Sequence, residues 1–315
     1  MKCHEIIIKS KNKNYLVTLA IGGNFYLDWK KYALPLWKKY CLRNKIGLIV
    51  IKKDLISKNS EYWKKRQWQK MLVGAYLLKS GVLIKNICSI DTDILINPFA
   101  PNIFKQHNEN KISIISESFN MPYNLEFVRK KVSFYRNKYY SKKYPLDSSI
   151  FMSVKNKYLY HRLKPQNDYA CTGVIVFNTK KFSGLMEKWF FKYKRNQNTL
   201  TGGGEEPIWN YEILKTKKVK KLDYRFQALW FYEMALNYPF LYKQKSKKNN
   251  TLKMCIESSL INNYFLHFPG SWHEGKMWKI KGILQSKKNN MTLKNFSRYL
   301  NTKVHGKPVG RILPK

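Results

Sequence analysis

Two aspartates lie within three residues of each other, as Asp91-Thr92-Asp93, directly after the apolar run 86–90. The chain contains only seven Asp, so the pairing draws attention. A carboxylate pair at the end of a strand offers the hard oxygen ligands that Mg²⁺ and Mn²⁺ prefer. Proteins commonly use such an ion on phosphate groups, so the pair indicates an enzyme that handles a nucleotide. The alternative is a pair of solvated turn residues.

His267 ends a second apolar run, just before Pro269-Gly270. A neutral imidazole at the end of a strand suits Mn²⁺ as a third protein ligand. The alternative is a partly buried histidine held by hydrogen bonds.

Two lysines are candidates for contact with a diphosphate or a sugar. Lys70 lies on the helix expected before the aspartates, with Arg66 one turn earlier on the same face. Lys276 follows Gly275. In a chain with 51 Lys, a solvated helix face explains such residues equally well.

Glu205 and Glu206 follow three consecutive glycines. Glycine gives the backbone freedom to approach a ligand closely. A carboxylate there could bind sugar hydroxyls or stabilise a developing oxocarbenium ion, as the carboxylates of glycosidases do. The alternative is a charged helix start, because acids and proline are favoured in a first helical turn.

The elements that must position these groups alternate between strand and helix. Apolar runs predict strands over 15–21, 46–51, 86–90 and 112–115, and helical spacing predicts helices over 28–42 and 61–79. Further along, we expect a strand over 171–177, a helix over 180–194, a helix opening at Gly202-Gly-Gly-Glu-Glu-Pro207, and a strand over 264–268. This order predicts the α/β class, with a Rossmann-like, mostly parallel central sheet and helices on both faces.

Ligands of such sheets bind at the carboxyl ends of the strands. Gly22-Gly23 and Asp91-Thr92-Asp93 both follow expected strands, so we predict that they meet at one edge. We expect one domain over residues 1–285. The basic, Tyr-rich stretch 119–165, helical over 124–140, is interpreted as an acceptor-side insertion, and 286–315 as a basic tail.

Charge and composition narrow the class of protein. The net charge is +41, but the basic residues are overwhelmingly Lys, with nine Arg, which favours an AT-rich coding bias over a dedicated phosphate-binding surface. The five scattered Cys predict neither a disulfide framework nor a metal cage. No run approaches the roughly 20 apolar residues of a membrane helix, and the first residues lack a signal-peptide layout. We therefore expect a cytoplasmic protein, with peripheral docking on an anionic membrane as a further hypothesis.

Three segments resemble a known family. KMLVGAYLLKSGVLIKNICSIDTDILINPFAPNIF resembles the part of GT-A glycosyltransferases in which a helix leads into the metal-binding DxD strand. NDYACTGVIVFNTKKF is similar to the later strand whose Gly lies beside the donor sugar, and HFPGSWHEGKMW to the C-terminal H-x-x-G element. The pattern is most similar to glycosyltransferase family 8, and the resemblance extends from about Tyr15 to Trp278.

The resemblance implies a GT-A fold and transfer of a hexose from a UDP-linked sugar to a glycan, lipid-linked or protein acceptor, with retention at the anomeric carbon. It assigns roles to the following residues: Mn²⁺ (or Mg²⁺) ligands Asp91, Asp93 and His267; nucleotide contacts Ala20, Ile21, Gly22 and Tyr26; diphosphate or sugar contacts Lys70 and Lys276; donor-site residues Thr92 and Gly173, the glycine leaving room for the donor. Glu205 and Glu206 are the catalytic candidates, in contact with the donor sugar or the acceptor. Two features depart from the family. Glu205-Glu206-Pro207 stands where Asp-Gln is usual, and Lys276 lies further from Gly270 than the family's Lys.

Three other functions remain open from the residues alone, and one of them is an inactive transferase-like domain that only binds glycans. A nucleotidyl- or phosphoryl-transfer enzyme could use the same two aspartates for two-metal chemistry, and it would need a third carboxylate nearby. A basic nucleic-acid-binding protein would gather its Lys and aromatic residues on one surface, whereas here the charge is spread along the whole chain.

Overall fold

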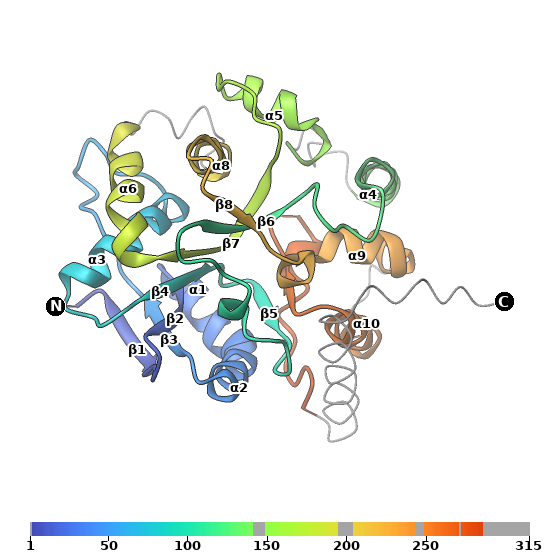
Figure 1. The fold of residues 1–315 in the computed structure, drawn as a ribbon. Helices are drawn as coiled ribbons and strands as arrows, with labels where there is room; N and C mark the ends of the chain where they lie inside the picture. Colours follow the sequence, from blue (N-terminus) through green and yellow to red (C-terminus); the bar gives the residue numbers. More distant parts are fainter. Residues whose placement is uncertain (1, 141–148, 195–203, 244–248, 271, 286–315) are drawn as a thin grey trace.

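The computed structural model describes residues 2–140, 149–194, 204–243, 249–270 and 272–285, arranged around one large mixed sheet (Figure 1). The expected tail over 286–315, and Gly202 and Gly203, lie outside the described residues. Within them, no helix is long and apolar enough to cross a membrane.

The large sheet has seven strands in the order β1-β3-β2-β4-β7-β6-β8. β2 pairs in parallel with β3 and β4, and β6 pairs in parallel with β8, whereas β1 and β7 run against their neighbours. The sheet is therefore mostly parallel in strand direction, as expected, with two antiparallel strands. The strands are β1 His4–Ile8, β2 Asn14–Leu19, β3 Gly47–Ile51, β4 Asn86–Ile90, β6 Ile112–Ser116, β7 Ala170–Asn178 and β8 Val219–Lys221.

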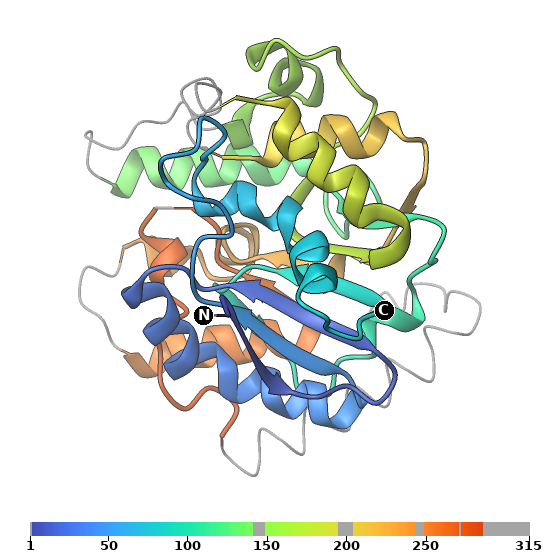
Figure 2. The same ribbon diagram turned by 90° about the vertical axis from the view of Figure 1, so that its left-hand side faces the viewer.

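Helices cover both faces of this sheet, as predicted, because its central strands are apolar on both sides. Leu16, Leu48 and Cys88 pack into one core with Trp37 of α2, while their neighbours along the strands pack into a second core with Met186 of α6. Figure 2 shows α2, in blue, and α6, in yellow-green, on opposite sides of the sheet. The α-helices are α1 Gly23–Asp28, α2 Leu34–Asn44, α3 Val73–Lys79, α4 Leu125–Tyr139, α5 Val154–Tyr160, α6 Thr179–Lys192, α8 Glu206–Lys215, α9 Trp230–Asn237 and α10 Asn249–Asn262.

A second, three-stranded sheet was not anticipated from the sequence. It has the order β5-β10-β9, formed by Ile94–Ile96, Phe265–His267 and Ala228–Leu229. β10 runs antiparallel to β5 and parallel to β9. The indole nitrogen of Trp37 donates a hydrogen bond to the carbonyl oxygen of Ile94 (2.8 Å), which ties this small sheet to α2. Because β5 follows β4 after only three residues, the small sheet begins at the predicted metal site.

Two expected helices are interrupted. Residues 28–42 are divided by a π-helical turn, η1 Trp29–Ala33, before α2, whose second residue is Pro35. Proline has no N–H for the helical hydrogen bond and clashes with the preceding turn, so a regular helix cannot continue through it.

The helix expected over 61–79 starts instead at the 3₁₀ helix η2 Arg66–Leu72 and continues as α3. A 3₁₀ helix has three residues per turn and so changes the phase of the buried stripe. As a result Leu77 is buried and Leu78 is exposed, while Trp68, Leu72 and Ala75 are buried.

The stretch 119–165 contains α4, a short 3₁₀ turn Ser149–Phe151 and α5. α4 matches the helix predicted over 124–140, and Asn124 caps it by accepting a hydrogen bond from the Phe127 amide (3.0 Å). Val128, Val132 and Arg136 form its inner face, packed toward α9. The helix therefore brings an arginine from this stretch into the interior of the protein.

Candidate functional site

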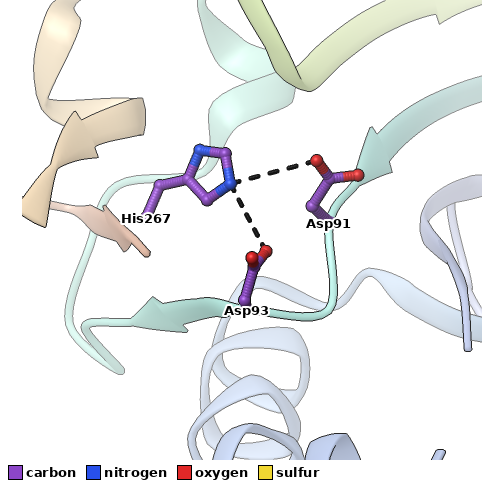
Figure 3. A group of neighbouring side chains, drawn as sticks. All are labelled: Asp91, Asp93 and His267. Atoms are coloured by element: carbon purple, nitrogen blue, oxygen red, sulfur yellow. Dashed lines mark ion pairs between the residues drawn. The ribbon is translucent and has the colours of Figure 1, made fainter. Parts of the chain in front are cut away.

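Asp91, Asp93 and His267 come together at the carboxyl end of β4 (Figure 3). The imidazole Nε2 of His267 lies 3.3 Å from a carboxylate oxygen of Asp93 and 3.9 Å from one of Asp91. Each residue offers one ligand atom, and these three atoms all lie within 4.8 Å of one another. The two carboxylates are partly exposed while His267 is buried, so a ligand can approach from the aspartate side.

Both sheets take part in placing these three residues. Asp91 and Asp93 belong to the turn between β4 and β5, and the Asp91 amide donates a hydrogen bond to the Gly173 carbonyl oxygen on β7 (2.9 Å). His267 pairs with Ile94 across β10 and β5, and the Phe268 amide donates to the Asp93 carbonyl oxygen (3.0 Å). Backbone hydrogen bonds between β5 and β10 thus hold His267 next to Asp93, although the two residues are far apart in the sequence.

The donor set fits a divalent ion. Two carboxylate oxygens and one imidazole nitrogen are the mixture that Mn²⁺ accepts, and their spacing allows them to converge on one point. In the described part of the chain, this is the one group of three potential metal ligands. Thr92 lies in the same turn, partly exposed between the two aspartates.

Gly173 packs against the histidine. A Cβ at this position would lie 2.4 Å from Cε1 of His267 and 2.6 Å from the side-chain nitrogen of Gln227. No side chain fits in that space, so glycine is required for the histidine to reach the aspartates. The structure thereby gives a reason for Gly173 that the sequence analysis did not consider, since it had assigned this glycine to the donor sugar.

Lys70 joins the site from η2 and is completely enclosed. Its ammonium nitrogen lies 3.0 Å from a carboxylate oxygen of Asp91 and 2.6 Å from one of Glu205, and it donates to the Thr172 carbonyl oxygen (3.1 Å). Burial disfavours the charge of Lys70, but the two carboxylates outweigh it and raise its pKa above the ordinary value for lysine. Lys70 therefore carries a positive charge and holds Asp91 in place from behind.

Glu205 is buried in the same ion pair. Its carboxylate also accepts a hydrogen bond from the Thr172 hydroxyl (2.7 Å), and the residue is only 3% exposed. With one of its oxygens satisfied by both an ammonium group and a hydroxyl, this carboxylate supports Lys70. The arrangement favours a structural role over the direct substrate contact predicted for it.

Glu206 instead faces a cavity of about 220 Å³. Burial raises the pKa of Glu206, Lys157 opposes this effect, and the charge of Glu117 reinforces it. The other residues lining the cavity come from five separate parts of the chain, and they are Glu117; Arg136, Ile150 and Lys157; Cys171; Leu229, Phe231 and Tyr232; and Pro269, Gly270 and Trp272.

The cavity adjoins the three-residue group. The Cys171 thiol lies 3.7 Å from Nδ1 of His267, and Leu229 pairs with His267 across β9 and β10. Charged groups around it are mostly compensated, because Glu117 accepts hydrogen bonds from both Arg129 and Lys157. Aromatic side chains and carboxylates around a cavity of this size suit a sugar ring, whose faces are apolar and whose edges carry hydroxyls.

Ala20, Ile21 and Gly22 follow β2 directly, beside the Asp91 turn, since the β2–β4 pairing continues toward that edge. Gly22 adopts a φ of 97°, which a side chain would strain, and α1 starts after it. Tyr26 is partly exposed on α1, with the ammonium groups of Lys30 and Lys52 over its ring at 5.8 and 5.6 Å. The structure therefore brings the predicted nucleotide contacts to the same edge as the aspartates.

Arg66, at the start of η2, is a further cation at this edge. Its guanidinium lies 3.3 Å from the centre of the Phe25 ring. Burial lowers the pKa of Arg66, and the charges of Asp91 and Asp93 counteract that effect. Lys276, by contrast, is exposed in the short 3₁₀ helix Glu274–Lys276, and none of the described acidic residues lies within ion-pair distance of it. Its predicted contact with a diphosphate stays a prediction.

Several residues of the site were missed by the sequence analysis, notably Gln227, Arg136 and Trp272. The Arg136 guanidinium donates to a Glu274 carboxylate oxygen (2.7 Å) and lies 4.4 Å from the centre of the Trp272 ring. Each of these residues is distant in sequence from its partners, and none belongs to a recognisable motif. Trp272 lies within the segment HFPGSWHEGKMW, which was the one local signal available.

Comparison with known proteins gives similarity only at the level of solved structures. No family model matches the chain, and no curated protein does so significantly. A crystal structure of a glycosyltransferase involved in glycosylation of the major capsid of PBCV-1 matches over 84% of this chain and 97% of its own, with a TM-score of 0.45 and 10% identity. The bifunctional glycosyltransferase WbbM, in its apo form, matches over 84% of this chain, also with a TM-score of 0.45, at 11% identity. This chain spans about half of WbbM, 47% of its length.

Proposed function

We propose that this protein is a metal-dependent glycosyltransferase that transfers a sugar from a nucleoside diphosphate sugar to a hydroxyl acceptor. The observation that carries the proposal is the convergence of Asp91, Asp93 and His267 at the carboxyl edge of the sheet, next to a sugar-sized cavity. The three side chains would hold an ion that binds the diphosphate of the donor. The cavity would accommodate the transferred sugar.

Asp91, Asp93 and His267 would hold the ion, which when bound supplies positive charge to the departing diphosphate. Lys70 keeps the Asp91 carboxylate in one orientation through an ion pair in which the ammonium group is buried and the carboxylate is partly exposed. Arg66 lies at the same edge, within the influence of both aspartates, and is placed to bind a phosphate oxygen. The nucleoside would extend from there toward residues 20–22 and Tyr26.

Among the described residues that line the cavity, Glu206 is the carboxylate that we assign to act on the sugar. Its carboxylate lines the cavity, and burial raises its pKa, so it is held in an environment that destabilises its negative charge. A carboxylate of this kind can stabilise positive charge developing at an anomeric carbon or accept a proton from an attacking hydroxyl. The same environment makes ionisation costly, which is typical of groups that take part in chemistry.

Two-metal phosphoryl transfer receives less support from the site. The described group contains two carboxylates and one imidazole, which suits one ion. Glu205, the further carboxylate at this position, is bound to the Lys70 ammonium group and to Thr172.

The decisive experiment is calorimetric titration of UDP with and without Mn²⁺. We expect Mn²⁺-dependent binding in the unaltered protein and its loss in Asp93→Asn. Asp93 is a sharper target than Asp91, because Asp91 also neutralises the buried Lys70. Glu187→Gln is a matched control: it removes one negative charge from a side chain of similar exposure (29% against 27%), which pairs with Lys79 on the surface.

Binding that ignores both Mn²⁺ and Asp93→Asn would overturn the proposal and indicate non-specific attraction by the +41 charge. Metal-dependent binding would lead to a screen of UDP-glucose and UDP-galactose, with hydrolysis of the donor as the readout. The configuration of the product, read by NMR at the anomeric proton, would test the predicted retention. The acceptor, whether glycan, lipid-linked or protein, and contact with an anionic membrane stay predictions.

A further inference from the structure

Gln227 is a buried side chain that contacts the histidine of the proposed metal site. Its amide nitrogen lies 3.1 Å from Nδ1 of His267, and the residue is 3% exposed. The amide oxygen of Gln227 is buried and has no hydrogen-bond partner. A buried amide oxygen without a donor is costly, so its persistence next to a candidate metal ligand calls for an explanation.

The arrangement fixes which imidazole nitrogen carries the proton when no ion is bound. The Gln227 amide N–H donates to Nδ1, so the ring proton lies on Nε2. Nε2 then carries its proton toward the Asp93 carboxylate, 3.3 Å away. In this tautomer Nε2 has no lone pair available for an ion.

Binding of an ion needs the opposite tautomer. His267 can ligate through Nε2 only if its proton moves to Nδ1, and Nδ1–H then needs an acceptor. Two groups lie near Nδ1, the amide of Gln227 and the Cys171 thiol at 3.7 Å. Sulfur is a weak acceptor, whereas a half-turn of the amide would place the unpartnered oxygen of Gln227 opposite Nδ1.

The packing around the pair leaves the amide little other freedom. Gly173 leaves room for both side chains, since a Cβ there would lie 2.6 Å from the Gln227 nitrogen. Gln227 immediately precedes β9, whose Leu229 pairs with His267, so the backbone of both residues is fixed by the small sheet. The half-turn of the terminal amide exchanges nitrogen and oxygen without moving either backbone.

We propose that Gln227 is a positioning residue that holds His267 in the metal-binding tautomer, by turning its amide so that the oxygen accepts from Nδ1–H when an ion binds. The inference rests on the proposed metal site. It explains the unpartnered oxygen as the group used in the metal-bound state. It also assigns a role to a residue that touches neither the ion nor the nucleotide.

Three variants test this inference, with the affinity for Mn²⁺ as the readout. Free Mn²⁺ is measured from its EPR signal during titration, with UDP absent and with UDP at a fixed concentration. Gln227→Met keeps the size of the side chain but accepts no strong hydrogen bond, and we expect it to weaken Mn²⁺ binding about 10- to 100-fold. Gln227→Glu accepts but cannot donate, and we expect affinity equal to or tighter than that of the unaltered protein. Cys171→Ala removes the other neighbour of Nδ1 and should change the affinity less than about threefold.

The outcomes separate this inference from the function it rests on. If the unaltered protein binds Mn²⁺ no better than Asp93→Asn, the metal site itself is refuted. If the unaltered protein binds Mn²⁺ and Gln227→Met binds it equally well, only the role of Gln227 is refuted. Weakening by Gln227→Glu as large as that by Gln227→Met would also refute it, because a merely structural role is not rescued by an acceptor. Should Gln227→Met fail to fold, the NMR spectrum of ¹⁵N-histidine-labelled unaltered protein decides: His267 should change from Nε2–H to Nδ1–H on addition of Zn²⁺, and an unchanged tautomer on binding contradicts the proposal.

Discussion

Glu205 and Glu206 are adjacent in the chain, yet they belong to two regions with opposite electrostatics. Glu205 lies in a buried ion pair with Lys70, where opposite charges compensate each other. Glu206 lines the cavity, and its pKa is raised because burial and nearby acidic groups disfavour its charge. The comparison teaches that the partner of a carboxylate, more than its position in a motif, decides whether it supports the fold or is available for chemistry.

Removing the charge of Glu205 should have the largest effect of the variants considered, and it should lower the free energy of unfolding. In Glu205→Gln the buried ammonium group of Lys70 loses the negative charge of one of its two described carboxylate partners and keeps that of Asp91. Breaking a buried ion pair from one side is strongly destabilising, so we expect the free energy of unfolding to fall by about 3 kcal/mol. Urea denaturation followed by circular dichroism measures this. Glu187→Gln, which breaks a surface pair, should stay within about 1 kcal/mol of the unaltered protein. Equal stability of the two variants would show that the Glu205–Lys70 pair supports the fold no more than a surface ion pair does.

Glu206→Gln, the same substitution at the next residue, should lower the rate of sugar transfer and leave the stability largely unchanged. We expect Glu206→Gln to lower the rate of sugar transfer, or of donor hydrolysis, by about 10²-fold, the usual contribution of a carboxylate acting in the transition state. Mn²⁺-dependent UDP binding should persist, because the metal ligands and Lys70 are untouched. Steady-state kinetics and calorimetry on one preparation separate the two effects. A Glu206→Gln protein as active as the original would assign the chemistry to another residue.

The sequence could not distinguish these two glutamates. Both follow the same glycines, and their roles depend on Lys70 and Lys157, which come from distant parts of the chain. The sequence did predict the central strands, because apolar runs mark buried strands. The grouping of Asp91, Asp93 and His267 was implied by the resemblance to GT-A glycosyltransferases, and the structure brings the three residues together. The strand predicted over 264–268 corresponds to β10, but β5 and β9 were not predicted, since strands of two and three residues carry no periodicity, and the small sheet was therefore missed. The cavity escaped prediction because its lining is assembled from separate segments by long-range packing.

Gly173→Ala tests whether the close packing of Gly173 against His267 is needed for metal binding. The new methyl group would lie 2.4 Å from Cε1 of His267, so the imidazole must shift from its present position beside the aspartates. We expect Mn²⁺ affinity to fall about 10-fold, an effect of the size found when ligand-orienting groups are changed. Gly184→Ala is the control, because a Cβ at that helical position meets nothing within 4 Å. It should leave Mn²⁺ binding unchanged, and similar losses in both variants would show that the effect is not local.

The smallest effect is the contribution of Glu206 to the dependence of stability on pH. Its pKa is raised in the folded protein, so the folded state holds this proton more tightly than the unfolded state does. The stabilisation is complete below the ordinary glutamate pKa of 4.5 and is lost as the pH rises through the folded-state value. Glu206→Gln cannot ionise, so its stability relative to the unaltered protein should increase as the pH rises from 4.5 to the folded-state pKa of Glu206, and should be constant above that value. The slope cannot exceed about 1.4 kcal/mol per pH unit for one group. Urea midpoints of both proteins across pH 4 to 8 give this difference, and a flat difference would mean that Glu206 is as well compensated in the fold as Glu205.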